Sequence, residues 1–337
     1  MARTESGTAQ TVLLDRQTDE AVAAVTSGDD SPDRQTAHAA VERIAEEGVV
    51  TRSALDDALG HASKVVSTPE TRVELAGIEL DGVRERAAPV ADVDVVAFRL
   101  DAFADRLEAV ESRIEALGED LQSLLARRDD VTYALARDLH RLHQAANECH
   151  HAADELLVDV EEFGRWLASH ERRVADLDED LDALDAALSD LSDAARAVRE
   201  ESPANPGLAW ASATLQNRVL GLLVDDVRAD AEGIRRLADR MEVQGGDVDG
   251  SLDRLDGRLD DLASRRTEIG SDLDDLARDP WIERFGEGIR AFEATVADVE
   301  PPVDWARVQE TLAAHRSSLG DAEPVANPTA ASDEETA

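Results

Sequence analysis

The sequence predicts an all-α protein: a long antiparallel helical coiled coil, or elongated helix bundle, with a small N-terminal helical module and disordered tails. Residues 93–201 contain no proline, and apolar residues recur in them at alternating steps of three and four. This spacing averages 3.5 residues and keeps one narrow seam on one side of a helix, as in coiled coils. Aromatic residues make up only 3% of the chain, which fits long helices better than a compact mixed core.

The composition is strongly acidic. The 337 residues include 75 acidic and 35 basic ones, for a formal charge of -40, and Lys64 is the only lysine. This bias is typical of a salt-in halophilic archaeon, in which dense carboxylates keep a surface hydrated while molar salt screens their repulsion. An acidic protein that captures basic partners is the alternative. We expect no nucleic-acid partner, because no third of the chain offers a basic surface.

The same sequence bounds the location of the protein. A single cysteine, Cys149, excludes an internal disulfide framework. The N-terminus lacks the apolar core of a secretory signal, and no run of about 18 apolar residues could span a bilayer. We therefore expect a cytoplasmic protein with no direct membrane insertion.

The N-terminal part is expected to hold only small elements. Residues 1–34 are polar, and we predict that they are mostly disordered, with room for one short helix. Residues 35–90 predict a small helical module: one helix ends at Gly48, Thr51 caps a second, and Pro69 marks a third start.

Residues 35–66 also have a helix-turn-helix layout, which makes a transcriptional regulator one alternative function. Asp56 and Asp57 lie near the start of the second helix, where a DNA reader would meet phosphates. A packing or dimerisation module is therefore the favoured interpretation.

Residues 93–201 are predicted to form one long coiled-coil helix, which at 1.5 Å per residue would span roughly 160 Å. Its register slips once, near residues 131–139, as a stutter that locally unwinds a supercoil. Arg128 and His170 occupy seam positions, and Arg266 does so in a later helix. Polar residues at such positions cost stability but fix register and partner number, so we expect these three to set the register.

Pro203 to Gly207 form the clearest break in the chain. Return helices are predicted over 208–243, 248–278 and 280–299, then a short helix over 304–319 and a disordered tail over 320–337. The return helices are together about as long as the central one. We therefore expect 208–299 to lie antiparallel along 93–201, although a parallel homodimer of the long helix stays open.

One cluster of residues has ligand chemistry. Four of the eight histidines and the only cysteine fall within residues 140–151. On a helix, His140, His143, Cys149 and His150 are candidate zinc ligands, which makes a metal-binding or metal-sensing protein a second alternative. The competing interpretation is a solvated helix flank, with Cys149 packing as a small apolar side chain. No metalloenzyme spacing and no phosphate-binding glycine loop is present, so we predict no catalytic residue and no further cofactor.

The segment Glu161-Glu162-Phe163-Gly164-Arg165-Trp166-Leu167, followed by Asp/Leu-rich heptads to Leu191, resembles a haloarchaeal family often labelled "halo transducer protein". The resemblance implies signal transduction, by analogy with the helical hairpins of chemotaxis receptors. The chain departs from those receptors in lacking a membrane span and their characteristic hairpin-tip sequence.

Together, these patterns predict a non-enzymatic cytoplasmic coiled-coil protein that mediates protein–protein interaction, as a scaffold or a signal-transduction relay. We expect its partners to be other proteins or a second copy of the chain, held through the heptad seams.

Overall fold

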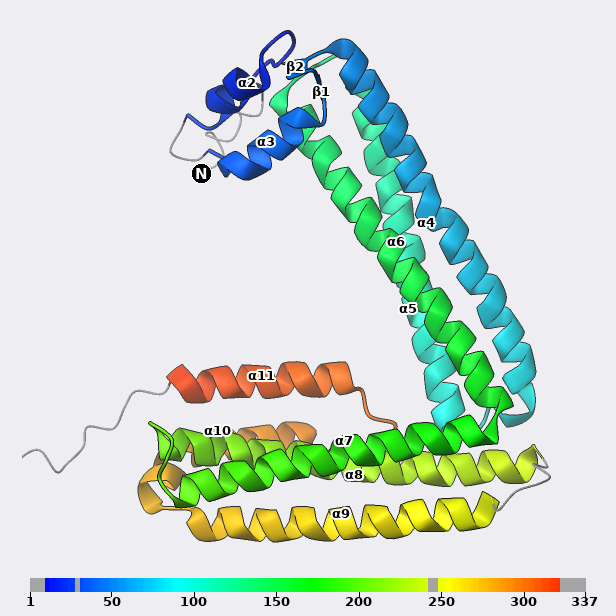
Figure 1. Cartoon of the computed structure of the whole chain (residues 1–337), viewed down its shortest axis with the longest axis vertical. Helices are drawn as coiled ribbons and strands as arrows, with labels where there is room; N and C mark the ends of the chain where they lie inside the picture. Colours follow the sequence, from blue (N-terminus) through cyan, green and yellow to red (C-terminus); the bar gives the residue numbers. More distant parts are fainter. Residues whose placement is uncertain (1–9, 28–30, 242–247, 322–337) are drawn as a thin grey trace, which may run out of the picture. The chain divides into compact units, whose positions relative to one another are not determined.

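The computed structural model describes residues 10–27, 31–241 and 248–321. The described chain is all-α, as predicted, apart from one two-stranded hairpin. It divides into two compact units (Figure 1). Unit 1 comprises Met1–Pro89 and Arg99–Leu167, and unit 2 comprises Val90–Phe98 and Ala168–Ala337. No helix in the described part of the chain is both long and apolar enough to cross a membrane.

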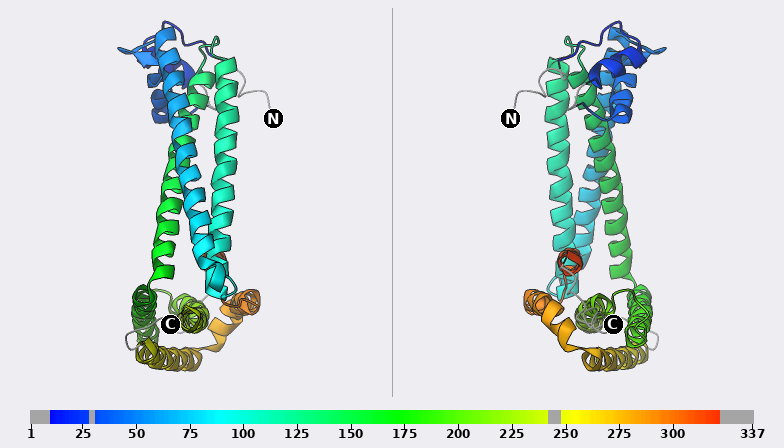
Figure 2. Two further views of the ribbon diagram at one scale, coloured as in Figure 1. Left: turned by 90° about the vertical axis from the view of Figure 1, so that its right-hand side faces the viewer. Right: turned by 90° about the vertical axis from the view of Figure 1, so that its left-hand side faces the viewer.

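Unit 1 is built on the long helices α4 (Arg52–Ala87), α5 (Asp94–Ala126) and α6 (Tyr133–Ala168), which lie side by side (Figures 1 and 2). Short turns join them, so α5 runs antiparallel to α4 and α6. Their buried apolar side chains recur every three or four residues and form one continuous core. That narrow stripe is what lets three helices share one seam.

Smaller elements close one end of unit 1: α2 (Thr18–Val25), α3 (Arg34–Glu42), and the antiparallel strands β1 (Ala45–Glu46) and β2 (Val49–Val50). The β1–β2 turn contains Gly48 at φ +81°, a left-handed conformation that glycine adopts without strain. Leu13 is fully buried, and its backbone N–H donates to the Val131 carbonyl at 2.9 Å.

The prediction that residues 1–34 are mostly disordered is therefore wrong for the part that the structure describes. Residues 10–27 contain α2, and Val22 and Val25 are buried in the unit 1 core. The apolar patches of this segment are too short to fold alone, but packing on neighbouring helices stabilises them. Residues 1–9 and 28–30 lie outside the described residues.

The N-terminal module also differs from the prediction, because α4 continues through Pro69 for 36 residues. Pro69 is buried in the seam between Val66 and Val73. An interior proline costs a helix a hydrogen bond and about 3 kcal/mol, and burial of the seam on both sides of it offsets that cost. The strands β1 and β2 lie where the helix-turn-helix layout placed a simple turn.

Residues 93–201 do not form one helix: they divide into α5, α6 and α7 (His170–Arg199). The predicted stutter is a chain reversal, in which the Thr132 hydroxyl accepts from the Leu135 N–H at 3.4 Å. Ser169 interrupts the next helix in an extended conformation and caps α7, its hydroxyl accepting from the Arg172 N–H at 3.3 Å. Seam spacing continues through both breaks, so the pattern alone conceals them.

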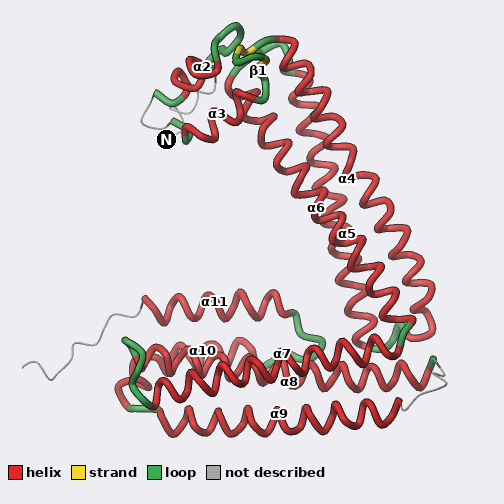
Figure 3. Tube along the Cα trace, viewed as in Figure 1, coloured by secondary structure: helices red, strands yellow, loops and turns green. Residues whose placement is uncertain are grey.

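Unit 2 contains α7, α8 (Pro206–Arg240), α9 (Val248–Leu276), α10 (Asp279–Val296) and α11 (Trp305–Asp321). Helices α7, α8 and α9 pack against one another, and α10 and α11 pack against α8 (Figure 3). The later helices overlap the predicted ranges. Of the predicted tail, 322–337 lies outside the described residues.

The predicted hairpin of 208–299 along 93–201 is wrong for most of its length. Only α7 and the first residues of α5 belong to the same unit as the return helices, whereas α5 from Arg99 and all of α6 to Leu167 share unit 1 with α4. The physical reason is that α4 supplies an apolar stripe long enough to cover α5 and α6. Each unit thus buries its own seam.

Gly207 allows two helices of unit 2 to approach closely. A Cβ at this position would lie 2.7 Å from Cδ1 of Trp281. The indole of Trp281 cannot move aside freely, because two side chains lie against it. The ring centroids of Trp210 and Trp281 are 6.0 Å apart, and Cζ of Arg278 lies 4.7 Å from the Trp281 ring centroid.

We predict that Gly207→Ala lowers the free energy of unfolding by about 1–3 kcal/mol, the usual range for overpacking. Urea denaturation in high salt, followed by circular dichroism, measures it. The matched control is Gly257→Ala in α9, where a Cβ meets nothing within 4 Å. That change should raise the free energy of unfolding by about 0.5–1 kcal/mol through helix propensity. Equal effects of the two changes would contradict the packing argument.

Candidate functional site

The predicted metal ligands lie on α6 but point to different surroundings. Cys149 is buried, with Sγ 3.9 Å from the Val110 carbonyl of α5, so it packs as a core side chain. His150 is half-buried and lies 3.3 Å from Asp154, with its ring tilted against His151. Within the described residues, no group of three or more His, Cys, Asp or Glu side chains is arranged to hold a metal ion. The structure therefore does not assemble His140, His143, Cys149 and His150 as a ligand set.

His143 instead belongs to a cluster of basic groups. It is 4% exposed and stacks on His61 of α4, with 5.4 Å between ring centroids. Its Nδ1 lies 3.0 Å from the Leu139 carbonyl; since a carbonyl can only accept, Nδ1 carries the proton in the neutral ring. Among the described residues, Nε2 of His143 and Nδ1 of His140 are buried without a hydrogen-bond partner.

Burial lowers the pKa of His143 from its ordinary value. The Leu139 carbonyl opposes this shift, while the charges of Arg43, His61 and His140 add to it. The pKa of His140 is lowered by burial and then by Arg43. The groups that act on His143 are thus three bases and a carbonyl, so a proton on this histidine is unfavourable in the folded state.

We predict that acid weakens the fold partly through His143. Its folded-state pKa lies below the ordinary value of 6.5, so the unfolded chain binds a proton first as the pH falls. The contribution to stability is fully present above pH 6.5 and is lost as the pH falls toward the folded-state pKa, at no more than about 1.4 kcal/mol per pH unit for one proton.

His143→Gln should flatten the dependence of the free energy of unfolding on pH below 6.5, measured by urea denaturation at a series of pH values. His151→Gln is the control, because His151 is exposed on the same helix and the change removes a histidine without altering the buried cluster. A slope that is the same in wild type and His143→Gln would contradict the burial argument.

The three polar residues predicted to lie in the seam have different surroundings in the structure. Arg128 is exposed in the α5–α6 turn, where its carbonyl accepts from Arg52 Nη1 at 2.6 Å, so its assignment to the seam is wrong. The reason is that the supposed stutter is a reversal. His170 is the first residue of α7 and half-buried, and burial lowers its pKa. Arg266 lies on α9 with its guanidinium against Gly221 of α8, 3.2 Å from the position of a Cβ there.

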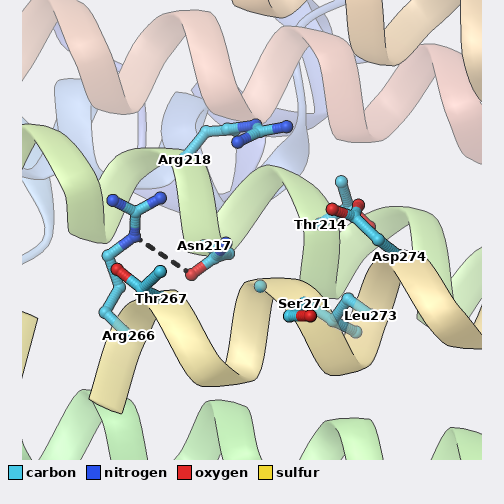
Figure 4. A pocket seen from close by; sticks show the side chains of 9 residues that line it. Thr214, Asn217, Arg218, Arg266, Thr267, Ser271, Leu273 and Asp274 are labelled. Carbon is cyan, nitrogen blue, oxygen red and sulfur yellow. Dashed lines mark hydrogen bonds between the residues drawn. The ribbon is translucent and has the colours of Figure 1, made fainter. Parts of the chain in front are cut away.

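Arg266 opens onto a polar pocket of about 240 Å³ between α8 and α9 (Figure 4). Two of its lining residues, Asn217 and Thr214, are buried polar side chains. The lining residues are Thr214, Asn217 and Arg218 of α8 and Arg266, Thr267, Gly270, Ser271, Leu273 and Asp274 of α9.

Asn217 is 3% exposed, and its Oδ1 accepts from Arg266 Nε at 3.3 Å. Gly270 makes room for it: a Cβ there would lie 2.6 Å from Asn217 Nδ2. Arg218 at the rim donates from Nε to Glu293 of α10 at 2.7 Å. Burial lowers the pKa of Arg266, the charge of Arg218 adds to that effect, and Asp225 opposes it. The guanidinium remains charged, in surroundings that hydrate it incompletely.

Sequence reasoning missed Asn217, Gly270 and a buried arginine of α7. Asn217 lies four residues after Ala213 and three before Leu220, so a polar residue in a seam was the available signal. In α7, Arg173 is 1% exposed whereas Val174 is half-buried, so an arginine and not the neighbouring valine takes the buried position. Comparisons with protein-family models, curated proteins and solved structures found no match.

Proposed function

We propose that the chain is a non-enzymatic helical protein that acts by binding other proteins, as a scaffold or a signal-transduction relay. The observation that supports it is an exposed apolar patch on unit 1, formed by Leu75 and Ile78 of α4 and Val158 of α6. Their side chains are 44%, 63% and 49% exposed. Such a patch on a highly charged surface is characteristic of an interaction site.

The three patch residues lie at a similar level along α4 and α6. Arg72 of α4 pairs with Asp154 of α6 at 3.1 Å, and the two helices run in the same direction (Figure 1). Leu75 follows Arg72 by three residues and Val158 follows Asp154 by four, so both lie about one turn beyond the ion pair. Ile78 follows Leu75 on the outer side of α4. The patch therefore occupies the outer face of the α4–α6 pair.

Because the seams are buried, the interface with a partner cannot be where the sequence predicted it. The seam was predicted to carry the partner interaction, but its leucines and valines are buried within each unit by that unit's own helices. An exposed face is left to contact a partner. Given the chain's charge of -40, the occupant we propose is an amphipathic helix of another protein, with an apolar stripe flanked by basic residues.

The sequence also supports a protein-binding role, and the two alternatives are disfavoured. Heptad spacing supports coiled-coil packing within the units, and the acidic composition supports work in the cytoplasm of a halophilic archaeon. The metal-sensor alternative has no supporting arrangement of ligands in the described residues. Asp56 and Asp57, both exposed at the start of α4, still disfavour DNA binding by residues 35–66.

A photo-reactive phenylalanine derivative at position 78, activated in cells that express the chain, tests the patch. We expect one discrete adduct, whose cross-linked peptide is identified by mass spectrometry as an amphipathic segment with basic flanks. The double change Leu75→Glu and Val158→Glu should remove the adduct, because two carboxylates would replace the apolar contact.

Ile282→Glu is the matched control, since Ile282 of α10 is exposed to the same extent as Leu75; the adduct should persist in it. An adduct that survives the double change, or one formed with a second copy of this chain, would count against the proposed occupant. Melting temperatures of all variants show whether the fold is intact.

A further inference from the structure

The pocket between α8 and α9 has a cationic end. Arg266, Asn217 and Arg218 lie together there, as Figure 4 shows. Asp274 lines the opposite end, eight residues further along α9, a rise of about 12 Å. Thr267 and Ser271 line the wall between the two ends. The Thr267 hydroxyl donates to the Ala263 carbonyl at 2.9 Å, which leaves the Ser271 hydroxyl as a donor there. A negatively charged group at the Arg266 end is therefore well separated from the acidic side chain of the same pocket.

In the described part of the chain Arg266 forms no ion pair with a carboxylate, whereas neighbouring arginines do, although the charge of Asp225 acts on it. Arg265 pairs with Asp185 of α7, and Arg258 pairs with Asp178 at 2.7 Å. In contrast, among the described residues Arg266 bonds to one polar side chain. That hydrogen bond runs from Arg266 Nε to Asn217 Oδ1. This leaves the terminal nitrogens of a half-buried guanidinium free to bind an anion, in a chain with 75 acidic residues.

Asn217 supplies a second donor. Arg266 Nε can only donate, so it fixes Oδ1 of Asn217 toward itself and leaves Nδ2 as the free end of the amide. No acceptor for Nδ2 is found in the described part of the chain, and Nδ2 is not one of the fully buried unpaired atoms there. Asn217 lines the pocket, so its Nδ2 is an accessible donor for a ligand.

We propose that this pocket binds a small oxyanion, a phosphate or a carboxylate, at its Arg266 end. The planar guanidinium offers two parallel N–H donors that match two oxygens of such an anion. The Asn217 amide would donate to one of these oxygens, and the Ser271 hydroxyl lines the same wall. Arg218 adds positive charge at the rim while Glu293 holds its Nε. The site lies in unit 2 and is independent of the protein-binding patch of unit 1.

Isothermal titration calorimetry with inorganic phosphate and, separately, with acetate, at constant potassium chloride concentration, tests the proposal. We expect saturable 1:1 binding of at least one of them, and the tighter binder shows which oxyanion the site prefers. Arg266→Gln should weaken that binding at least tenfold. Arg266→Lys should weaken it as well, because an ammonium keeps the charge and loses the paired donors.

Arg254→Gln is the matched control. Arg254 is exposed on the same helix and bonds to the Ser251 hydroxyl and the Gly250 carbonyl, so the change removes the same charge outside the pocket and should leave the affinity unaltered. Equal weakening by Arg254→Gln and Arg266→Gln would show attraction by net charge alone and would overturn the proposal.

A measurement on the wild-type chain guards against misfolded variants. In nitrogen-15 spectra, the Asn217 side-chain amide and the Arg266 Nε–H should shift during titration with the tighter-binding anion, and both should saturate together. Absence of saturable binding of both anions, or saturation without a shift of these two signals, would overturn the assignment of the pocket.

Discussion

The structure depends on the burial of narrow apolar seams along its helices. Each fully buried leucine or valine contributes roughly 1.5–3 kcal/mol, and such residues recur every three or four positions in α4, α6, α7 and α8. Two neighbouring helices are enough to bury a stripe this narrow. The chain therefore forms two separate cores, one in each unit. The outer faces are left to acidic residues, many of them in ion pairs that contribute little to stability individually.

The helical class could be predicted from this spacing, but the chain reversals could not. The α5–α6 turn runs through Arg127-Arg128-Asp129-Asp130, which contains neither glycine nor proline. Its signal is Thr132, whose hydroxyl caps α6, and a threonine is too common to mark a break by itself. Pro69 gave the opposite error: a proline predicts a helix start, yet the seam continues across it into Val73. Local residue types indicate where a helix could end. Whether it does end there depends on how much apolar surface the helix buries on both sides of that position.

The predicted metal site was wrong, and the contact between Asn217 and Gly270 was missed, for a related reason. Residues 140–151 are dense in ligand types, but on one helix Cys149 faces the core while His150, one position on, faces Asp154. A rotation of 100° per residue separates neighbours, so proximity in sequence does not make a ligand set. Asn217 and Gly270 show the converse. They meet only because α8 and α9 pack antiparallel in one particular register, which heptad spacing alone leaves open.

The Arg266–Asn217 pair also bears on why a polar pair is kept inside a seam. A hydrogen bond of 3.3 Å stabilises a fold by about 0.5–1.5 kcal/mol net, or somewhat more for a charged donor, whereas desolvating a charged group costs several kcal/mol when burial is complete. For a half-buried guanidinium the two contributions are comparable, so the pair adds little stability by itself. Register offers one reason to keep it, since Asn217 fits only opposite Gly270. Register alone, however, requires neither the charge of Arg266 nor the free donor of Asn217. An anion in the pocket would satisfy both groups, and this makes the polar pair a binding element as well as an alignment device.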